Sequence, residues 1–335
     1  MIGYLLYPRG YCFGVKRIVD MTDQVLKLYK SVYVVEDIVH NKLFMNGVQA
    51  RGVTKVQSID DVPDGSAIMF STRGIPSKML KKADEKQLTV VDATCPIVKE
   101  LQDAVLEKAE TGYAIILIGN RTHQQIATLL GATDSDDMYV VYSDMDVDLL
   151  PDLSNKKVVY FTQTSLYSND VAKIVNALVT KIPHIEVGQS GKADNICSET
   201  LDRQKVIAEI ASTIDLLIVV GSLHSANAVS LVRTGEACNI KRVVCIDAPD
   251  AIQNDLLDNV EKFALISATS IDEATIKSVE DTLQNLAGIK YVIYPQSDTQ
   301  IVSATQTVIG TQSASDNQPI SNVQSTPDSK KALNS

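Results

Sequence analysis

Three cysteines in this chain occupy equivalent positions, each between an apolar run and a stretch whose apolar residues recur three and four apart. They are Cys12, Cys95 and Cys197, in YPRGYCFGV, VVDATCPIV and KADNICSET. The spacing predicts that each cysteine lies at the N-terminus of a helix. Free backbone N–H groups and the helix dipole favour the thiolate there, and the thiolate is the form that binds metals. Three thiolates from distant parts of the chain suggest one shared metal centre.

The number of repeated cysteines restricts the kind of centre. A structural zinc site usually has four protein ligands, so three cysteines better suit an iron–sulfur cluster with one open iron. A zinc-bound structural protein and three simply buried cysteines are the alternatives, and the threefold placement argues against the second. Cys238 and Cys245 lie in or beside apolar segments outside the repeat, and we expect them to be buried structural residues.

Three of the four histidines also occupy repeated positions, in polar turns that follow short apolar runs. His40, His123 and His224 lie in VYVVEDIVHN, AIILIGNRTHQQ and LLIVVGSLHSAN. With neighbouring hydroxyls and amides, such histidines can donate several hydrogen bonds to one phosphate-like group. His40 and His123 are the stronger candidates. Near His224, the side chains of Ser225 and Asn227 could bind the anion instead.

One arginine occupies a similar position. Arg73, in FSTRGIPS, follows a predicted strand and precedes a predicted helix. A loop arginine is usually only solvated, but at this polar edge a planar guanidinium could bind phosphate oxygens in bidentate fashion. The remaining histidine, His184, lies between Pro183 and an apolar run and is expected to be structural.

The elements that carry these residues repeat three times. Each repeat has about four short apolar runs rich in β-branched residues, alternating with helical segments, as in a parallel sheet covered on both faces. The sequence therefore predicts three α/β units, at residues 1–94, 95–194 and 195–294. The third repeat ends without a cysteine, so we expect the run at residues 2–7 to pair with the third unit. Ligand-binding strand ends that face inward would enclose a central cavity.

The composition restricts the class of protein. A chain of 335 residues with 45% hydrophobic residues can form a packed core. The net charge of −10, without a basic stripe, argues against a nucleic-acid partner. No apolar stretch is long enough to span a bilayer, no secretory signal is evident, and five scattered cysteines fit a reducing compartment, so we expect a cytoplasmic protein. Residues 295–335 are rich in Ser, Thr, Gln and Asn and are expected to be mostly disordered.

Over about residues 1–290 the sequence resembles the 4-hydroxy-3-methylbut-2-enyl diphosphate reductase family, which catalyses the last step of the non-mevalonate isoprenoid pathway. The most specific motifs are PRGYCFGV, IVHN, VDATCP, LIGNRTHQQ, TQTSL, NICSET and VVGSLHSAN. The resemblance implies a pseudo-threefold trefoil around a 4Fe-4S cluster held by Cys12, Cys95 and Cys197. The substrate's hydroxyl would bind the open iron. Two electrons from a ferredoxin- or flavodoxin-type donor, with protons, would remove the hydroxyl as water and give isopentenyl and dimethylallyl diphosphate.

The resemblance also implies roles for residues around the cluster. Thr164 and Ser165 would lie beside the reacting carbons. Arg73 stands where the family has a histidine, in the same substrate pocket. The expected ligands of the diphosphate are His40, His123, Ser225, Asn227 and Ser270.

Several positions depart from the family pattern. Ala226 replaces a serine of the diphosphate pocket, and Arg73 preserves a cation but not the proton chemistry of an imidazole. At a catalytic position, Gln125 replaces the glutamate that supplies protons, and an amide cannot titrate. Two hypotheses follow. The chain is the reductase, with proton transfer slowed or rerouted through the diphosphate, Thr164 or water; or it is a divergent paralogue that acts on another phosphorylated compound or serves as an iron–sulfur binding or redox-sensing module.

Overall fold

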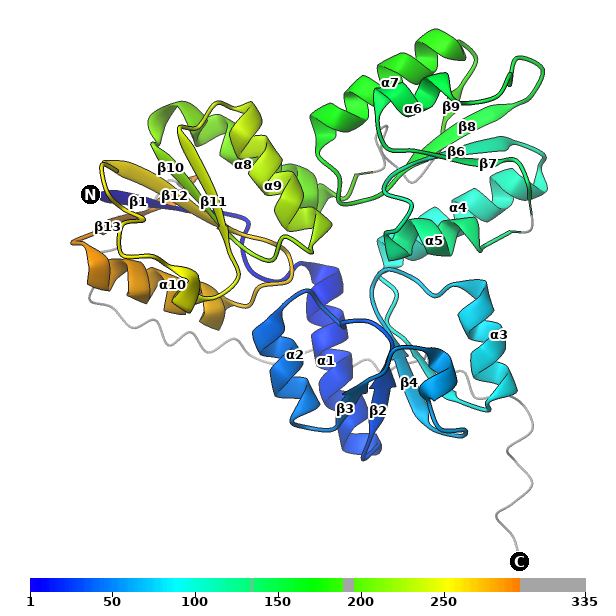
Figure 1. The fold of residues 1–335 in the computed structure, drawn as a ribbon, viewed down its shortest axis with the longest axis horizontal. Coiled ribbons are helices and arrows are strands. Elements are labelled where there is room, and N and C mark those ends of the chain that lie inside the picture. The colour runs from blue at the N-terminus through cyan, green and yellow to red at the C-terminus, as the bar shows by residue number, and fades with distance from the viewer. Residues whose placement is uncertain (134, 189–195, 296–335) are drawn as a thin grey trace, which may run out of the picture.

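The computed structural model describes residues 1–295 except 134 and 189–195, and these residues form three lobes around a common centre (Figure 1). Each lobe contains one parallel β-sheet. The prediction of three parallel-sheet α/β units is therefore confirmed. The tail that we expect to be disordered lies, from residue 296 onward, outside the described residues. None of the helices in the described part is long and apolar enough to cross a bilayer.

The first sheet has the strand order β3-β2-β4-β5. Its strands are β2 (Val32–Val34), β3 (Val53–Lys55), β4 (Ala67–Phe70) and β5 (Thr89–Asp92), and its helices are α1 (Phe13–Leu28), α2 (Lys42–Gln49) and α3 (Ser77–Glu85). The apolar periodicity after the first cysteine becomes the buried face of α1, where Val15, Ile18 and Val25 pack against the sheet.

The second sheet has the equivalent order β7-β6-β8-β9. Its strands are β6 (Ala114–Ile118), β7 (Met138–Val141), β8 (Val158–Thr162) and β9 (Glu186–Val187), and its helices are α4 (Pro96–Glu110), α5 (Gln124–Leu130), α6 (Asp144–Asp148) and α7 (Ser168–Lys181). All five residues of β6 are buried, because α4 and α5 cover one face of the sheet and α7 covers the other.

The third sheet repeats the same order with one strand inserted, β11-β10-β12-β1-β13. Its strands are β10 (Leu216–Val220), β11 (Arg242–Ile246), β12 (Lys262–Ser267), β13 (Lys290–Tyr294) and β1 (Ile2–Leu6), and its helices are α8 (Ser198–Ile210), α9 (Ala226–Ala237) and α10 (Glu273–Leu286). The N-terminal strand β1 pairs in parallel with both β12 and β13. Gly3 is required there, because a Cβ atom would lie 2.5 Å from the ring of Phe263.

The shared strand order places the chemistry-bearing loops at matching positions. In a parallel sheet, the carboxyl ends of the strands meet at one edge. The loops after β2, β6 and β10 carry His40, His123 and His224, and the loops after β1, β5 and β9 lead to the three cysteines. The repeated fold therefore brings the three histidine-bearing loops and the three cysteines toward one region.

Candidate functional site

Each repeated cysteine is the N-cap residue of a helix, as the sequence predicts: Cys12 of α1, Cys95 of α4 and Cys197 of α8. All three line one cavity of about 140 Å³. The N-terminus of α1 lies against the second cysteine, since a Cβ at Gly14 would be 2.9 Å from the Cys95 Sγ. A residue larger than glycine would therefore disturb the thiol.

The backbone holds the three cysteines in equivalent ways. Each cysteine N–H donates a hydrogen bond to the carbonyl of a threonine. This threonine lies two residues after β4, β8 or β12, the strand that is third in the order of its sheet. These bonds are Cys12 to Thr269 at 3.2 Å, Cys95 to Thr72 at 3.1 Å and Cys197 to Thr164 at 3.0 Å. The thiols are thus positioned by regular main-chain geometry, which is preorganised before any ligand binds.

At two of the cysteines, burial opposes the effect of the helix N-terminus. Burial raises the pKa of the Cys12 and Cys197 thiols, and the lowering effect of N–H groups from the following helix is smaller. The N–H groups at these helix N-termini thus favour the thiolate, as predicted, but in the protein alone burial outweighs them. A bound metal would have to displace the thiol protons, and its positive charge would stabilise the thiolates.

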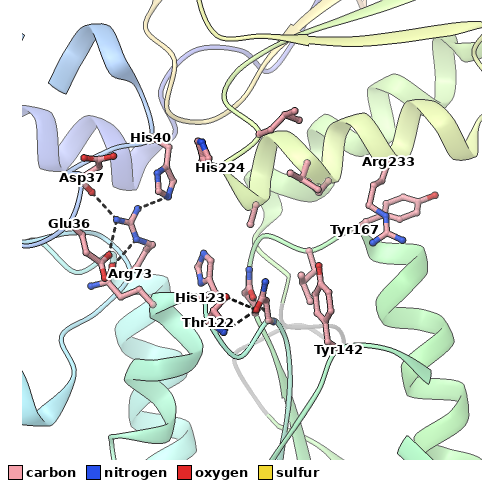
Figure 2. A pocket seen from close by; sticks show the side chains of 18 of the residues that line it. Glu36, Asp37, His40, Arg73, Thr122, His123, Tyr142, Tyr167, His224 and Arg233 are labelled. Atoms are coloured by element: carbon pink, nitrogen blue, oxygen red, sulfur yellow. Dashed lines mark hydrogen bonds and ion pairs between the residues drawn. The ribbon is translucent and has the colours of Figure 1, made fainter. Parts of the chain in front are cut away.

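A larger cavity of about 600 Å³ adjoins the cysteine cavity and is lined by residues of all three units (Figure 2). Four residues line both cavities: His40, Arg73, His123 and Ala226. The third repeated histidine, His224, is exposed and lines only the larger cavity. The first two histidines therefore lie where the two cavities meet.

His40 and His123 are neutral at pH 7. Burial, followed by the nearby Arg73, lowers the pKa of each to about 4. Nδ1 of His123 accepts a hydrogen bond from the Gln125 N–H at 3.2 Å, so the ring proton is on Nε2. Nε2 of His40 lies 3.4 Å from Nη1 of Arg73, a group that can only donate, so this ring carries its proton on Nδ1. Each imidazole thus offers one N–H donor.

Gln125 lines the cysteine cavity, which is called the inner cavity below. In the part of the chain that the structure describes, the oxygen of its side-chain amide is hydrogen-bonded, but the nitrogen is not. The side chain is 2% exposed. Its Oε1 accepts from the Thr164 N–H at 3.2 Å and from the Thr164 hydroxyl at 3.1 Å, which fixes the amide orientation. Within the described residues, the buried Nε2 has no hydrogen-bond partner. The site therefore contains an unsatisfied N–H donor where a bound oxygen could accept.

The predicted hydroxyl and amide ligands also reach the inner cavity. Ser225 is the N-cap of α9, and Asn227 accepts from the Thr269 N–H at 3.0 Å while donating to Thr200 Oγ1 at 3.2 Å. Ser165 accepts a hydrogen bond from Gln163 at 3.1 Å. Ser270 donates one to the His40 carbonyl at 3.3 Å. The structure thus brings together all the predicted site residues around two joined cavities.

Comparison with known proteins identifies the family. A family model described as "LytB protein" matches residues 4–284. The chain belongs to the LytB family. It is 37% identical over 283 residues to the apicoplast 4-hydroxy-3-methylbut-2-enyl diphosphate reductase of Plasmodium falciparum, a match that covers 84% of this chain but only about half (52%) of that relative. The reductase of Actinobacillus pleuropneumoniae is 32% identical over 285 residues, with 84% of this chain and 90% of that protein covered.

Solved structures agree with this assignment. The P. falciparum reductase has a TM-score of 0.83 at 34% identity, covering 90% of this chain and 95% of that one. A second reductase, described as the terminal enzyme of the non-mevalonate pathway, has a TM-score of 0.60 at 25% identity, covering 85% and 100%.

The sequence of this LytB-family chain did not point to one residue behind the cysteines, Arg203. Its side chain is 1% exposed, and its guanidinium donates to the carbonyls of Gly10 at 3.0 Å, Glu199 at 2.9 Å and Ser267 at 3.3 Å. It also pairs with the Glu199 carboxylate at 2.7 Å. These contacts join the loop before Cys12 to the helix after Cys197. Helical periodicity alone makes a buried arginine look like a surface residue.

Replacing Arg203 with methionine should lower the free energy of unfolding by roughly 2–4 kcal/mol, because two buried carbonyls and one partly buried carbonyl each lose a donor. Thermal unfolding of the variant would show this as a lower midpoint. The matched control is Lys205→Met on the same helix, whose side chain is 76% exposed and lies 3.9 Å from Glu209. We expect the control to change stability by less than about 0.5 kcal/mol. Equal effects of the two substitutions would contradict a joining role for Arg203.

Proposed function

We propose that this protein is an iron–sulfur reductase that converts 4-hydroxy-3-methylbut-2-enyl diphosphate to isopentenyl and dimethylallyl diphosphate. The observation that carries the proposal is the cavity lined by three cysteines, one from each repeat, which adjoins a second cavity with donors for an anion. Family membership supports it, since the named relatives are reductases of this substrate. A cytoplasmic location and a ferredoxin- or flavodoxin-type electron donor complete the proposal.

The donor set fits a 4Fe-4S cluster better than a single metal ion. Among the residues that the structure describes, no three His, Cys, Asp or Glu side chains are grouped closely enough to hold one ion. In a cluster, each thiolate binds a different iron, so the three thiols need only surround a common cavity, as Cys12, Cys95 and Cys197 do. When bound, the cluster would supply single electrons and one open iron. These three residues would be its protein ligands.

The surrounding residues have roles that follow from their hydrogen-bonding capacity. The neutral imidazoles of His40 and His123, with Ser225 and Asn227, would donate hydrogen bonds to the diphosphate. The free Nε2–H of Gln125 would donate to the substrate oxygen. Removal of the hydroxyl consumes two electrons and two protons, breaks one C–O bond, forms one C–H bond and releases water. Gln125 holds the oxygen but cannot supply a proton.

A second candidate function rests on that same amide. A pocket with an N–H donor in place of an acid would bind a phosphorylated ligand beside the cluster without reducing it rapidly. The chain would then be a divergent paralogue, acting on another phosphorylated compound or serving as an iron–sulfur binding or redox-sensing module. The position of Gln125 at the inner cavity favours this candidate.

Two measurements separate these functions. Anaerobic reconstitution with iron and sulfide should give a brown protein with the absorbance and EPR signal of a 4Fe-4S cluster. A colourless protein that binds zinc would reject both iron–sulfur functions. Turnover of the diphosphate substrate with a chemical reductant should then give the two isoprenoid products. An intact cluster without product would reject the reductase and leave the paralogue.

Binding of inorganic diphosphate should become tighter as the pH falls from 8 toward 5. The pKa of His40 and of His123 is about 4 in the free protein, and an adjacent anion raises both values, so the complex takes up protons. By linkage, affinity then rises with falling pH, by up to about tenfold per pH unit for each histidine that gains a proton. Calorimetry in buffers of different ionisation enthalpy measures this uptake.

The ligand's own protonation also changes over this range, so a variant must separate the two effects. His123→Gln retains a hydrogen-bond donor but cannot titrate. We expect its pH dependence to be shallower than that of the wild type. Identical pH profiles would show that His123 stays neutral in the complex.

A further inference from the structure

The lysine and arginine side chains of the larger cavity are paired with carboxylates of the protein. Of the described residues that line it, three are lysine or arginine, and each is paired with a carboxylate that also lines the cavity. The pairs are Arg73 with Glu36 at 3.2 Å, Lys55 with Asp37 at 2.6 Å and Arg233 with Asp170 at 2.7 Å. His40 and His123 are neutral at pH 7 before a ligand binds. Among the residues that the structure describes, an anion that enters this cavity therefore meets only lysine and arginine side chains that are already paired with carboxylates.

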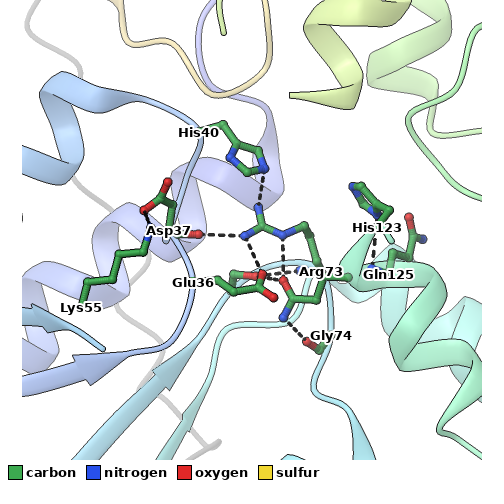
Figure 3. A network of polar contacts seen from close by, with 10 residues as sticks. Glu36, Asp37, His40, Lys55, Arg73, Gly74, His123 and Gln125 are labelled. Carbon is green, nitrogen blue, oxygen red and sulfur yellow. Dashed lines mark hydrogen bonds and ion pairs between the residues drawn. The ribbon is translucent and has the colours of Figure 1, made fainter. Parts of the chain in front are cut away.

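Arg73 is the cation beside the two histidines, and neutral groups hold its guanidinium in place (Figure 3). Its Nε donates to Gln124 Oε1 at 2.8 Å, and its Nη2 donates to the Asp37 carbonyl at 2.8 Å. Gln124 is itself held by the Ser71 hydroxyl at 3.0 Å and the Gly74 carbonyl at 3.1 Å. The orientation of the guanidinium therefore does not depend on Glu36.

The contact with Glu36 is the weaker one. A single carboxylate oxygen lies 3.2 Å from Nη2, and no other hydrogen bond or ion pair of this side chain occurs within the described residues. The Glu36 side chain is 40% exposed, whereas that of Arg73 is 14% exposed. The carboxylate can rotate into solvent at low cost, but the guanidinium cannot leave. We propose that the Glu36 carboxylate stands at Arg73 where a ligand anion would bind, so that a ligand must compete with this carboxylate and binds less tightly because of it.

This role has a consequence for selectivity. A diphosphate carries more negative charge than a carboxylate and offers several oxygens to a fixed guanidinium, so it displaces Glu36. Inorganic phosphate has less charge and fewer oxygens with which to reach the histidines at the same time. Displacing Glu36 costs the same for either anion, so only a ligand with enough further contacts, such as a diphosphate, still binds tightly. The inference rests on the proposed function for the identity of the natural ligand, but anion binding can be measured without turnover.

The test is calorimetric binding of inorganic diphosphate and inorganic phosphate to the reconstituted protein and its variants at fixed pH and ionic strength. Glu36→Gln should bind diphosphate roughly fivefold more tightly, the range expected for release of a partly exposed ion pair. Binding of inorganic phosphate should tighten by a similar factor, because the same cost of freeing Arg73 is removed for either anion. Glu36→Ser, which removes the acceptor as well, should show the same changes and serves if the glutamine variant does not fold.

Two further variants separate release of Arg73 from a general change in charge. Asp37→Asn removes one negative charge from the same cavity, but its carboxylate pairs with Lys55 instead of Arg73. We expect a smaller gain for this control. In an Arg73→Gln background, Glu36→Gln should give no gain, because the competing cation is absent. Equal gains for Glu36→Gln and Asp37→Asn that persist without Arg73, or no gain in Glu36→Gln, would overturn the inference. A protein that binds diphosphate as described but makes no isoprenoid would reject only the proposed function.

Discussion

Replacing Gln125 with glutamate should raise the rate of substrate reduction by about a hundredfold to ten-thousandfold, the range typical of a positioned general acid. One carboxylate oxygen can accept the N–H and the hydroxyl of Thr164, as Gln125 Oε1 does. The other oxygen then takes the place of the unpaired Nε2 at the inner cavity, where it can carry a proton. Because the position is 2% exposed, burial raises the pKa of the new acid and keeps it protonated closer to neutral pH.

The neighbouring residue provides the control for this substitution. Gln124→Glu makes the same chemical change on the same helix, but that side chain contacts Ser71, Arg73 and Gly74. We expect no gain in turnover from it. The measurement is product formation by reconstituted protein with a chemical reductant, at cluster contents matched between variants. If Gln125→Glu turned over no faster than the wild type, proton supply would not be the limiting defect, and the paralogue function would gain support.

The repeat explains why the fold and the cysteine positions could be predicted. Short buried strands and helical periodicity are local signals, and their threefold recurrence located Cys12, Cys95 and Cys197 at equivalent helix N-termini before any contact was known. The shared strand order of the three sheets follows from the same repetition. A repeated pattern is informative because each copy tests the others.

The contacts that decide the chemistry are not local, and the sequence does not reveal them. Arg73 reaches Glu36 and Gln124, which are 37 and 51 positions away, and Arg203 reaches Gly10 across 193 positions. The sequence predicts an arginine available to an anion, whereas the folded chain already pairs it with a carboxylate. Burial likewise outweighs the helix terminus in setting the pKa of the Cys12 thiol. Burial and long-range pairing depend on the folded structure, so residue type and spacing alone could not give them.

Replacing Cys95 with serine should abolish the cluster, which is the largest effect that we expect from any single substitution. Serine leaves the N-cap geometry intact but removes the one thiolate that the second unit contributes to the cavity. After anaerobic reconstitution, iron content should fall from about four per chain to nearly none, and the brown colour should be lost. Absorbance, EPR and iron analysis measure the result directly.

The matched control is Cys238→Ser, at the C-terminal end of α9, where the thiol is half-buried and lies outside both cavities. This variant should retain the full cluster. Because the three proposed ligands come from three units, cluster binding should also raise the thermal midpoint by joining those units, and Cys95→Ser should lose that increase while Cys238→Ser keeps it. Equal loss of iron in both variants would place the metal elsewhere. Retention of about one zinc per chain in wild type, without iron, would show that the three thiols surround a zinc site and that the reductase chemistry is absent.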